Sequence, residues 1–210
     1  MIQLFKTSVL AMIIAFSGHS MAFGIKLPGV GGADVGGLED KQTKMLALMQ
    51  VALTDLLESQ KLLANALDLK EQVAAIEDSQ AAVSGGEIDK KVLKQVQKST
   101  LAFNKSIQEL NDSGAALNED QKAAFQQAMV PYARGTIAMF SSLNIAKDAA
   151  SDISGIKNPL DLRKIGSLIY VVKELPKLIT NFSSSTKSLI GMGKANNIET
   201  DSLSNIEIPT

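Results

Sequence analysis

The sequence predicts an all-α fold, an antiparallel up-down bundle of four long helices. Three observations lead to this fold class. Apolar residues recur every three or four positions over long stretches between residues 39 and 193, which is the spacing of one face of a helix. No stretch shows the two-residue alternation that is typical of a half-buried strand. Short segments rich in Gly, Asn, Asp and Pro separate the periodic stretches, and short connections favour antiparallel neighbours.

The first predicted helix is a single long element that begins at Glu39 and ends at the segment Ser84-Gly-Gly-Glu87. This segment interrupts the apolar spacing and provides a Ser-x-x-Glu capping box for the next helix. The second helix repeats the apolar spacing from Leu93 to Leu110.

The third predicted helix begins after Asn118, a favoured N-cap residue that has Gln121 three positions later. Gly155 ends it. The fourth helix then starts with Asn158 as its N-cap and Pro159 at its first position, where the missing N–H costs nothing. The bundle domain therefore covers residues 39–193.

Several residues interrupt the regular pattern inside these helices. Pro131 and Pro176 lie within the third and fourth helices, where each removes one backbone hydrogen bond and is expected to kink its helix. Such kinks either open a ligand pocket in the bundle or only curve a helix around the core. Four polar residues lie on otherwise apolar faces, where they either fix helix register or bind a ligand: Gln60, Thr100, Thr136 and Thr186.

The N-terminal segment 1–22 has the features of a secretory signal peptide. Lys6 precedes an apolar run from Val9 to Phe16, and Ser20 and Ala22 occupy the small-residue positions of a cleavage site. The run is shorter than the roughly 20 apolar residues that a spanning helix needs, although an uncleaved anchor is the alternative. We expect cleavage after Ala22 and export to the periplasm or the extracellular space.

Two segments outside the bundle are predicted to lack fixed structure. Residues 23–38 are rich in glycine, but no Gly-Lys-Ser/Thr follows as in a phosphate-binding loop, and Asp34 stands where a dinucleotide site needs its third glycine. We expect a flexible leader here. Residues 194–210 are polar and rich in turn-forming residues, which predicts a loose tail.

The composition excludes many kinds of site. The chain has no Cys, and its one histidine, His19, lies in the predicted signal peptide. Cys- or His-ligated metal centres, Ser-His-Asp triads and thiol nucleophiles are therefore not expected, and no cofactor or metal is predicted. The formal net charge is −1 without a basic block, so nucleic acid is not an expected partner.

The remaining candidates for catalysis have simpler explanations. Ser184 and Lys187 lie one helical turn apart, as in serine-lysine hydrolases, but the partner motifs of those enzymes are missing. Carboxylate pairs such as Asp55 and Glu58 fall on polar helix faces, where solvation explains them. We therefore expect a protein that is not an enzyme and has no catalytic residues.

The third helix suggests where a partner binds. Between Met129 and Ala146 it is apolar nearly all round, and such a helix must be covered on every side. We predict that Val130, Ile137 and Ile145 form a binding face for a protein partner, a lipid or membrane surface, or a second copy of the chain. The alternative is internal cover, by the second half of the first helix or by apolar residues of the tail: Ile198, Leu203, Ile206 and Ile208.

The function predicted from these observations is protein–protein binding by an exported helical bundle, as an adaptor, chaperone-like or structural protein. The alternative is a carrier of a lipid or other apolar ligand, or a helical protein that inserts into membranes. The absence of Cys and His from the predicted mature chain limits the chemistry of either role, but it does not distinguish them.

The signal-peptide prediction has a direct test. The exported protein should begin at Phe23, because cleavage follows the small residue Ala22. N-terminal sequencing of the protein purified from its native compartment checks this. A membrane-bound protein that retains Met1 would contradict it.

Overall fold

The computed structural model describes residues 35–86 and 88–204, and all regular elements within them are α-helices, as predicted. Residues 1–34 and 205–210 lie outside this part, and with them the predicted signal peptide and most of the leader. The described helices are α1 (Val35–Ala66), α2 (Lys70–Ser84), α3 (Lys90–Asp112), α4 (Glu119–Ser154), α5 (Pro159–Lys164), α6 (Gly166–Ala195) and α7 (Asp201–Ser204).

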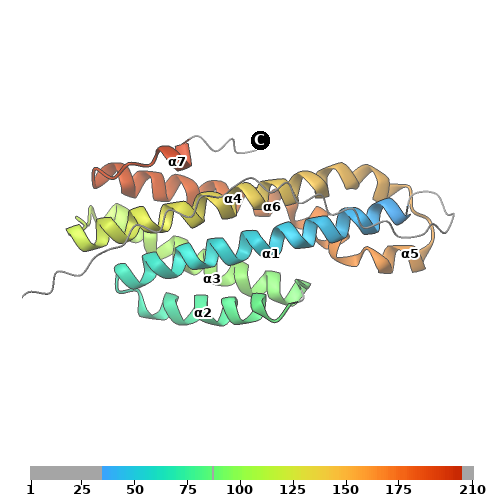
Figure 1. Cartoon of the computed structure of the whole chain (residues 1–210), viewed down its shortest axis with the longest axis horizontal. Coiled ribbons are helices and arrows are strands. Elements are labelled where there is room, and N and C mark those ends of the chain that lie inside the picture. Colours follow the sequence, from blue (N-terminus) through green and yellow to red (C-terminus); the bar gives the residue numbers. More distant parts are fainter. Residues whose placement is uncertain (1–34, 87, 205–210) are drawn as a thin grey trace, which may run out of the picture. The chain divides into compact units, whose positions relative to one another are not determined.

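Among the described residues, the long helices α1, α2, α3, α4 and α6 alternate in direction along the chain (Figure 1). For α1 and α4, two polar contacts show that the helices run in opposite directions. Lys41 near the start of α1 pairs with Asp152 near the end of α4, at 2.7 Å. At the other end of this helix pair, Gln121 Nε2 donates to the carbonyl of Ala66 at 3.0 Å. α1 and α4 are therefore antiparallel over nearly their whole length.

The segment predicted as one helix from Glu39 to Ser84 is in fact a hairpin of two helices, α1 and α2, so the prediction of a single long helix is wrong and a four-helix arrangement is not confirmed. The chain turns at Asp68, whose φ of 55° is left-handed, and Leu69 N donates to Ala64 O at 2.8 Å to close the end of α1. Asp tolerates this conformation, but a sequence reading expects Gly or Pro at such a break.

Helix α2 folds back along α1 and then packs against α3. Lys61 and Glu77 form an ion pair at 2.7 Å between α1 and α2. Between α2 and α3, the Ser79 hydroxyl donates to Ser99 Oγ at 2.9 Å. The hairpin therefore places α2 beside α1 and α3, and α2 does not continue α1 in a straight line (Figure 1).

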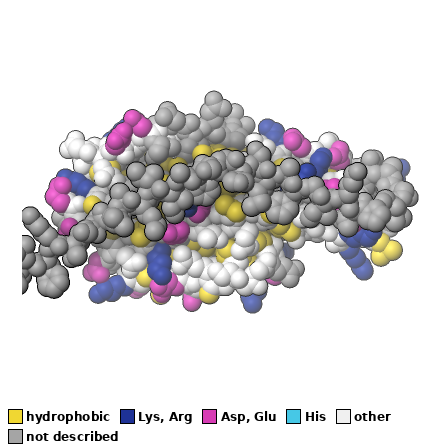
Figure 2. All heavy atoms as spheres, viewed as in Figure 1, with side chains coloured by type: hydrophobic (Ala, Val, Ile, Leu, Met, Phe, Trp, Pro, Cys, Tyr) yellow, Lys and Arg dark blue, Asp and Glu magenta, His cyan; other side chains and the backbone are white. Residues whose placement is uncertain are grey.

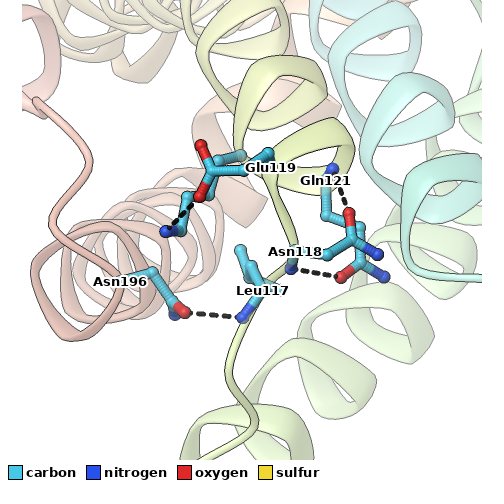
Figure 3. Close-up of polar contacts among 6 residues, drawn as sticks. Leu117, Asn118, Glu119, Gln121 and Asn196 are labelled. Carbon is cyan, nitrogen blue, oxygen red and sulfur yellow. Dashed lines mark hydrogen bonds and ion pairs between the residues drawn. The ribbon is translucent and has the colours of Figure 1, made fainter.

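The N-caps agree with the sequence in two of three cases. Asn118 and Gln121 form the predicted capping box, in which each side chain accepts from the other's backbone N–H (Figure 3). Asn158 caps α5 as predicted. The predicted box at Ser84 is wrong. Ser84 is the last residue of α2, and α3 is capped by Asp89, whose carboxylate accepts from Val92 N at 2.8 Å.

The fourth predicted helix is divided at Ile165 into α5 and α6. The side chain of Gln42 from α1 bridges this break. Its Nε2 donates to the carbonyl of Lys164 at 2.9 Å, and its Oε1 accepts from Leu168 N at 3.1 Å. A side chain distant in sequence thus satisfies backbone groups that a continuous helix would pair internally.

The helical domain extends beyond the predicted limits of 39 and 193 at both ends. α1 begins at Val35, and Leu38 is buried. At the other end Asn196 accepts from Leu117 N at 2.7 Å (Figure 3), and Ile198 and Leu203 are buried where α7 packs against α4 and α6. Residues 194–204 are therefore part of the fold, because they contribute apolar side chains to its core.

Small residues allow α1 and α4 to pack closely. Gly135 has no room for a side chain, since a Cβ there would lie 2.8 Å from Leu56 Cγ and 2.9 Å from Ala52 O. Buried small residues recur every seven positions along α4, which places them on one helix face: Ala128, Gly135, Ser142 and Ala149.

α4 also packs against α6, with large side chains that include Tyr132. Across this contact, Tyr132 Oη lies 3.2 Å from Thr186 Oγ1. Thr186 donates its own proton to Phe182 O, so the Tyr132 hydroxyl is the donor between them. Two of the polar residues that interrupt the apolar faces also pair, as Gln60 Nε2 donates to Thr100 Oγ1 at 3.3 Å.

We predict that Gly135→Ala lowers the free energy of unfolding by about 2 kcal/mol, because overpacking outweighs the gain in helix propensity. Gly191→Ala in α6 is the matched control. Its Cβ would meet only Asn111 Nδ2, at an ordinary 3.5 Å, so a gain of roughly 0.5 kcal/mol is expected. Urea denaturation measures both. Equal effects at the two glycines would show that α1 and α4 are not closely packed.

A second prediction concerns alkaline pH. Burial raises the pKa of Tyr132 to about 12, whereas an unfolded tyrosine titrates near 10. The unfolded state therefore loses its proton first, and stability falls as pH rises from about 10 to 12. At pH 11 the native protein should lose about 1.4 kcal/mol more than Tyr132→Phe, relative to pH 8. Denaturation of both proteins at the two pH values tests this, and equal losses would contradict it.

Candidate functional site

An ion pair between α1 and α4 organises the candidate site. Arg134 Nη2 lies 2.8 Å from Asp55 Oδ1, and Arg134 Nε donates to Asp55 Oδ2 at 3.2 Å, so both carboxylate oxygens accept from one guanidinium. The Asp55 side chain is only 13% exposed, whereas that of Arg134 is 60% exposed. The pair therefore closes the contact between the helices on one side and presents part of the guanidinium to solvent.

Apolar side chains flank this ion pair on both helices. Val130 and Ile137 lie four residues before and three residues after Arg134, which places all three on one face of α4. Val51 lies four residues before Asp55 on α1 in the same way. Because the ion pair joins the two faces, these residues belong to one surface. We call Val51, Asp55, Val130, Arg134 and Ile137 the α1–α4 surface.

The three predicted binding residues differ in how far their side chains are exposed. Val130 is 61% exposed and Ile137 is 57% exposed, and Val51 on α1 is 53% exposed. Ile145 is partly buried and packs against the core, so its side chain is less available than those of the other two. The structure thus places Val130 and Ile137 on one exposed face of α4, whereas Ile145 packs against the core. Binding through these residues remains a prediction.

The question of what covers the third predicted helix is answered in part. α4 packs against α1, where Gly135 allows a close approach, and also against α6, and Ile198 and Leu203 of the tail are buried. The second half of the predicted first helix, α2, packs against α1 and α3 instead. None of the described residues buries Val130 or Ile137. Ile206 and Ile208 lie outside the described part.

The sequence reading missed Val51 and the ion pair. It placed Asp55 on a solvated polar face, but Asp55 is buried and paired with Arg134. A usable signal was present, since Arg134 is a single arginine within a long apolar stretch. A charge in such a position needs a partner of opposite sign when it is partly desolvated.

The candidates for catalysis are not brought together. Ser184 and Lys187 are both exposed on α6, and within the described residues no hydrogen bond joins them. In the same part of the chain, no group of three or more His, Asp or Glu could hold a metal ion. None of the described helices is long and apolar enough to cross a membrane.

Charge on the surface is mixed. On the face drawn in Figure 2, the visible Lys and Arg side chains alternate with Asp and Glu, and hydrophobic side chains appear between them. Several described charges are paired on the surface, as in Lys61 with Glu77 and Lys122 with Glu119. The exposed apolar side chains of the α1–α4 surface therefore distinguish it from the rest of the surface more clearly than its charge does.

No protein-family model matches the chain, and neither a curated protein nor a solved structure is significantly similar to it. The described part of the chain is an all-helical protein.

Proposed function

We propose that this chain is an exported, non-enzymatic binding protein that docks a protein partner on the α1–α4 surface. The observation that carries this proposal is the exposure of Val51, Val130 and Ile137 around one ion pair on two closely packed helices. Large apolar side chains held on a rigid scaffold are typical of the buried centre of a protein interface.

The ion pair also supports a protein partner. Arg134 uses Nε and Nη2 for Asp55, and more than half of its side chain is exposed. Arginine is enriched at the energetic centres of interfaces, where its remaining N–H groups bond to carbonyl or carboxylate oxygens. We expect a partner helix that presents apolar side chains together with one such acceptor.

Export remains part of the proposal because residues 1–22, which lie outside the described residues, have the sequence features of a signal peptide. A protein without Cys does not depend on the redox state of its compartment for disulfide formation. The proposed role is that of an adaptor, chaperone-like or structural protein in the periplasm or outside the cell.

We predict that Ile137→Asp weakens partner binding at least about tenfold, because it places an uncompensated charge against an apolar partner surface. Its helical circular dichroism and melting temperature should stay nearly unchanged, since Ile137 is exposed. The matched control is Leu160→Asp, which makes the same kind of change at an exposed leucine of α5.

Photocrosslinking identifies the partner for this test. Two variants are expressed in the native envelope, one with a photoreactive residue at position 137 and one with it at position 160. A partner crosslinked from 137 and not from 160, whose binding Ile137→Asp weakens, supports the proposal; a crosslinked second copy would identify self-association. Identical products from both positions, or a large loss of stability in Ile137→Asp, would contradict it.

A further inference from the structure

A groove lies on the surface between α4 and α6, and none of the residues of the α1–α4 surface lines it. Its volume is about 390 Å³. Leu143 of α4 and Leu175, Pro176 and Ile179 of α6 provide its apolar lining. Small-molecule sites commonly have volumes of roughly 300 to 1,000 Å³ and a mostly apolar lining with few polar groups.

The contact between α4 and α6 is covered at its other end. There α7 packs against both helices, and the tail residues Ile198 and Leu203 are buried. At the groove no described residue of the tail is present, and Pro176 and Thr180 are exposed. The Thr180 hydroxyl donates to the carbonyl of Pro176 at 2.9 Å, so it is occupied within its own helix. The apolar groove is therefore open to solvent.

Lys147 is the one cationic side chain that lines the groove. No carboxylate of the described residues lies within ion-pair distance of its ammonium group. Glu174, one residue before Leu175, pairs with Lys177 at 4.0 Å instead. A cation without a partner at the edge of an apolar groove favours a ligand that combines an anionic head with a hydrocarbon chain.

We propose that this groove binds a long-chain fatty acid. The hydrocarbon chain lies against Leu143, Leu175 and Ile179, and the carboxylate pairs with the Lys147 ammonium group. A single lysine matches a carboxylate of one negative charge, whereas phosphate recognition usually gathers arginine forks or several donors. The volume is near the lower end for ligand sites, which favours one acyl chain over two. This binding site is separate from the proposed protein-docking function.

The test measures displacement of the fluorescent fatty acid cis-parinaric acid from the full chain. Oleate and the uncharged oleyl alcohol serve as competitors. Lys147→Glu should weaken the affinity for oleate at least about tenfold, since repulsion replaces attraction, while the affinity for oleyl alcohol changes little. Lys173→Glu is the matched control. Lys173 is an exposed lysine of α6, two residues before Leu175, and it does not line the groove. This control variant should bind oleate like the native chain.

A second variant tests the apolar lining. Ile179→Asp should lower the affinity for both oleate and oleyl alcohol, because Ile179 lines the groove. Circular dichroism verifies that this variant remains folded. Equal loss of oleate affinity in Lys147→Glu and Lys173→Glu would overturn the proposal. Binding that appears only in a chain shortened to end at Ser204 would also overturn it, because residues 205–210 would then occupy the groove in the full chain.

Discussion

The close packing of α1 against α4 is the constraint on which the rest of the fold depends. Gly135 allows this approach, since any side chain there would meet Leu56 and the backbone of Ala52. Buried small residues at seven-residue intervals continue the contact along α4. Helices that approach closely make many dispersion contacts with each other, and this dense packing leaves them little freedom to move relative to each other. The pair therefore forms a rigid centre to which the other elements are attached.

The two sides of this pair have different roles. On one side α6 completes the core, with Tyr132 bonded to Thr186, and the end of the chain adds Ile198 and Leu203. On the other side the Asp55–Arg134 pair closes the contact, and apolar residues remain exposed around it. Binding surfaces supported by a rigid scaffold lose little conformational entropy when they are occupied. The proposed docking function follows from this asymmetry.

Helices α2 and α3 are attached through buried apolar side chains, such as Ile76 and Phe103, and also through hydrogen bonds. One hydrogen bond joins the two helices at Ser79 and Ser99, and another joins α3 to α6 between Asn104 and Ser185. The hydrogen bond from Gln60 to Thr100 connects α3 to α1. Such bonds replace bonds to water and contribute a modest net stability, roughly 1 kcal/mol each. Helices α2 and α3 pack less extensively against their neighbours than α1 and α4 pack against each other.

Local sequence signals predicted the helices but not the long-range contacts that divide and join them. Apolar spacing and the Asn118 capping box depend on neighbours within a few residues, and the structure agrees with both. The break at Asp68 has no glycine or proline, and the break at Ile165 depends on Gln42, which is distant in sequence. For the site, the all-round apolar character of α4 identified Val130 and Ile137. Asp55 and Arg134 could not be paired before the register of α1 against α4 was known.

Native-state hydrogen exchange tests most directly whether the α1–α4 pair is the rigid centre. Amides of buried helices exchange slowly when they open only with the whole domain, whereas weakly attached elements open at a lower free energy. The account predicts that the slowest amides lie in α1 and α4 around Ala52 and Gly135, and that those of α2 exchange faster. Amides of α1 that exchange as fast as those of α2 would contradict it.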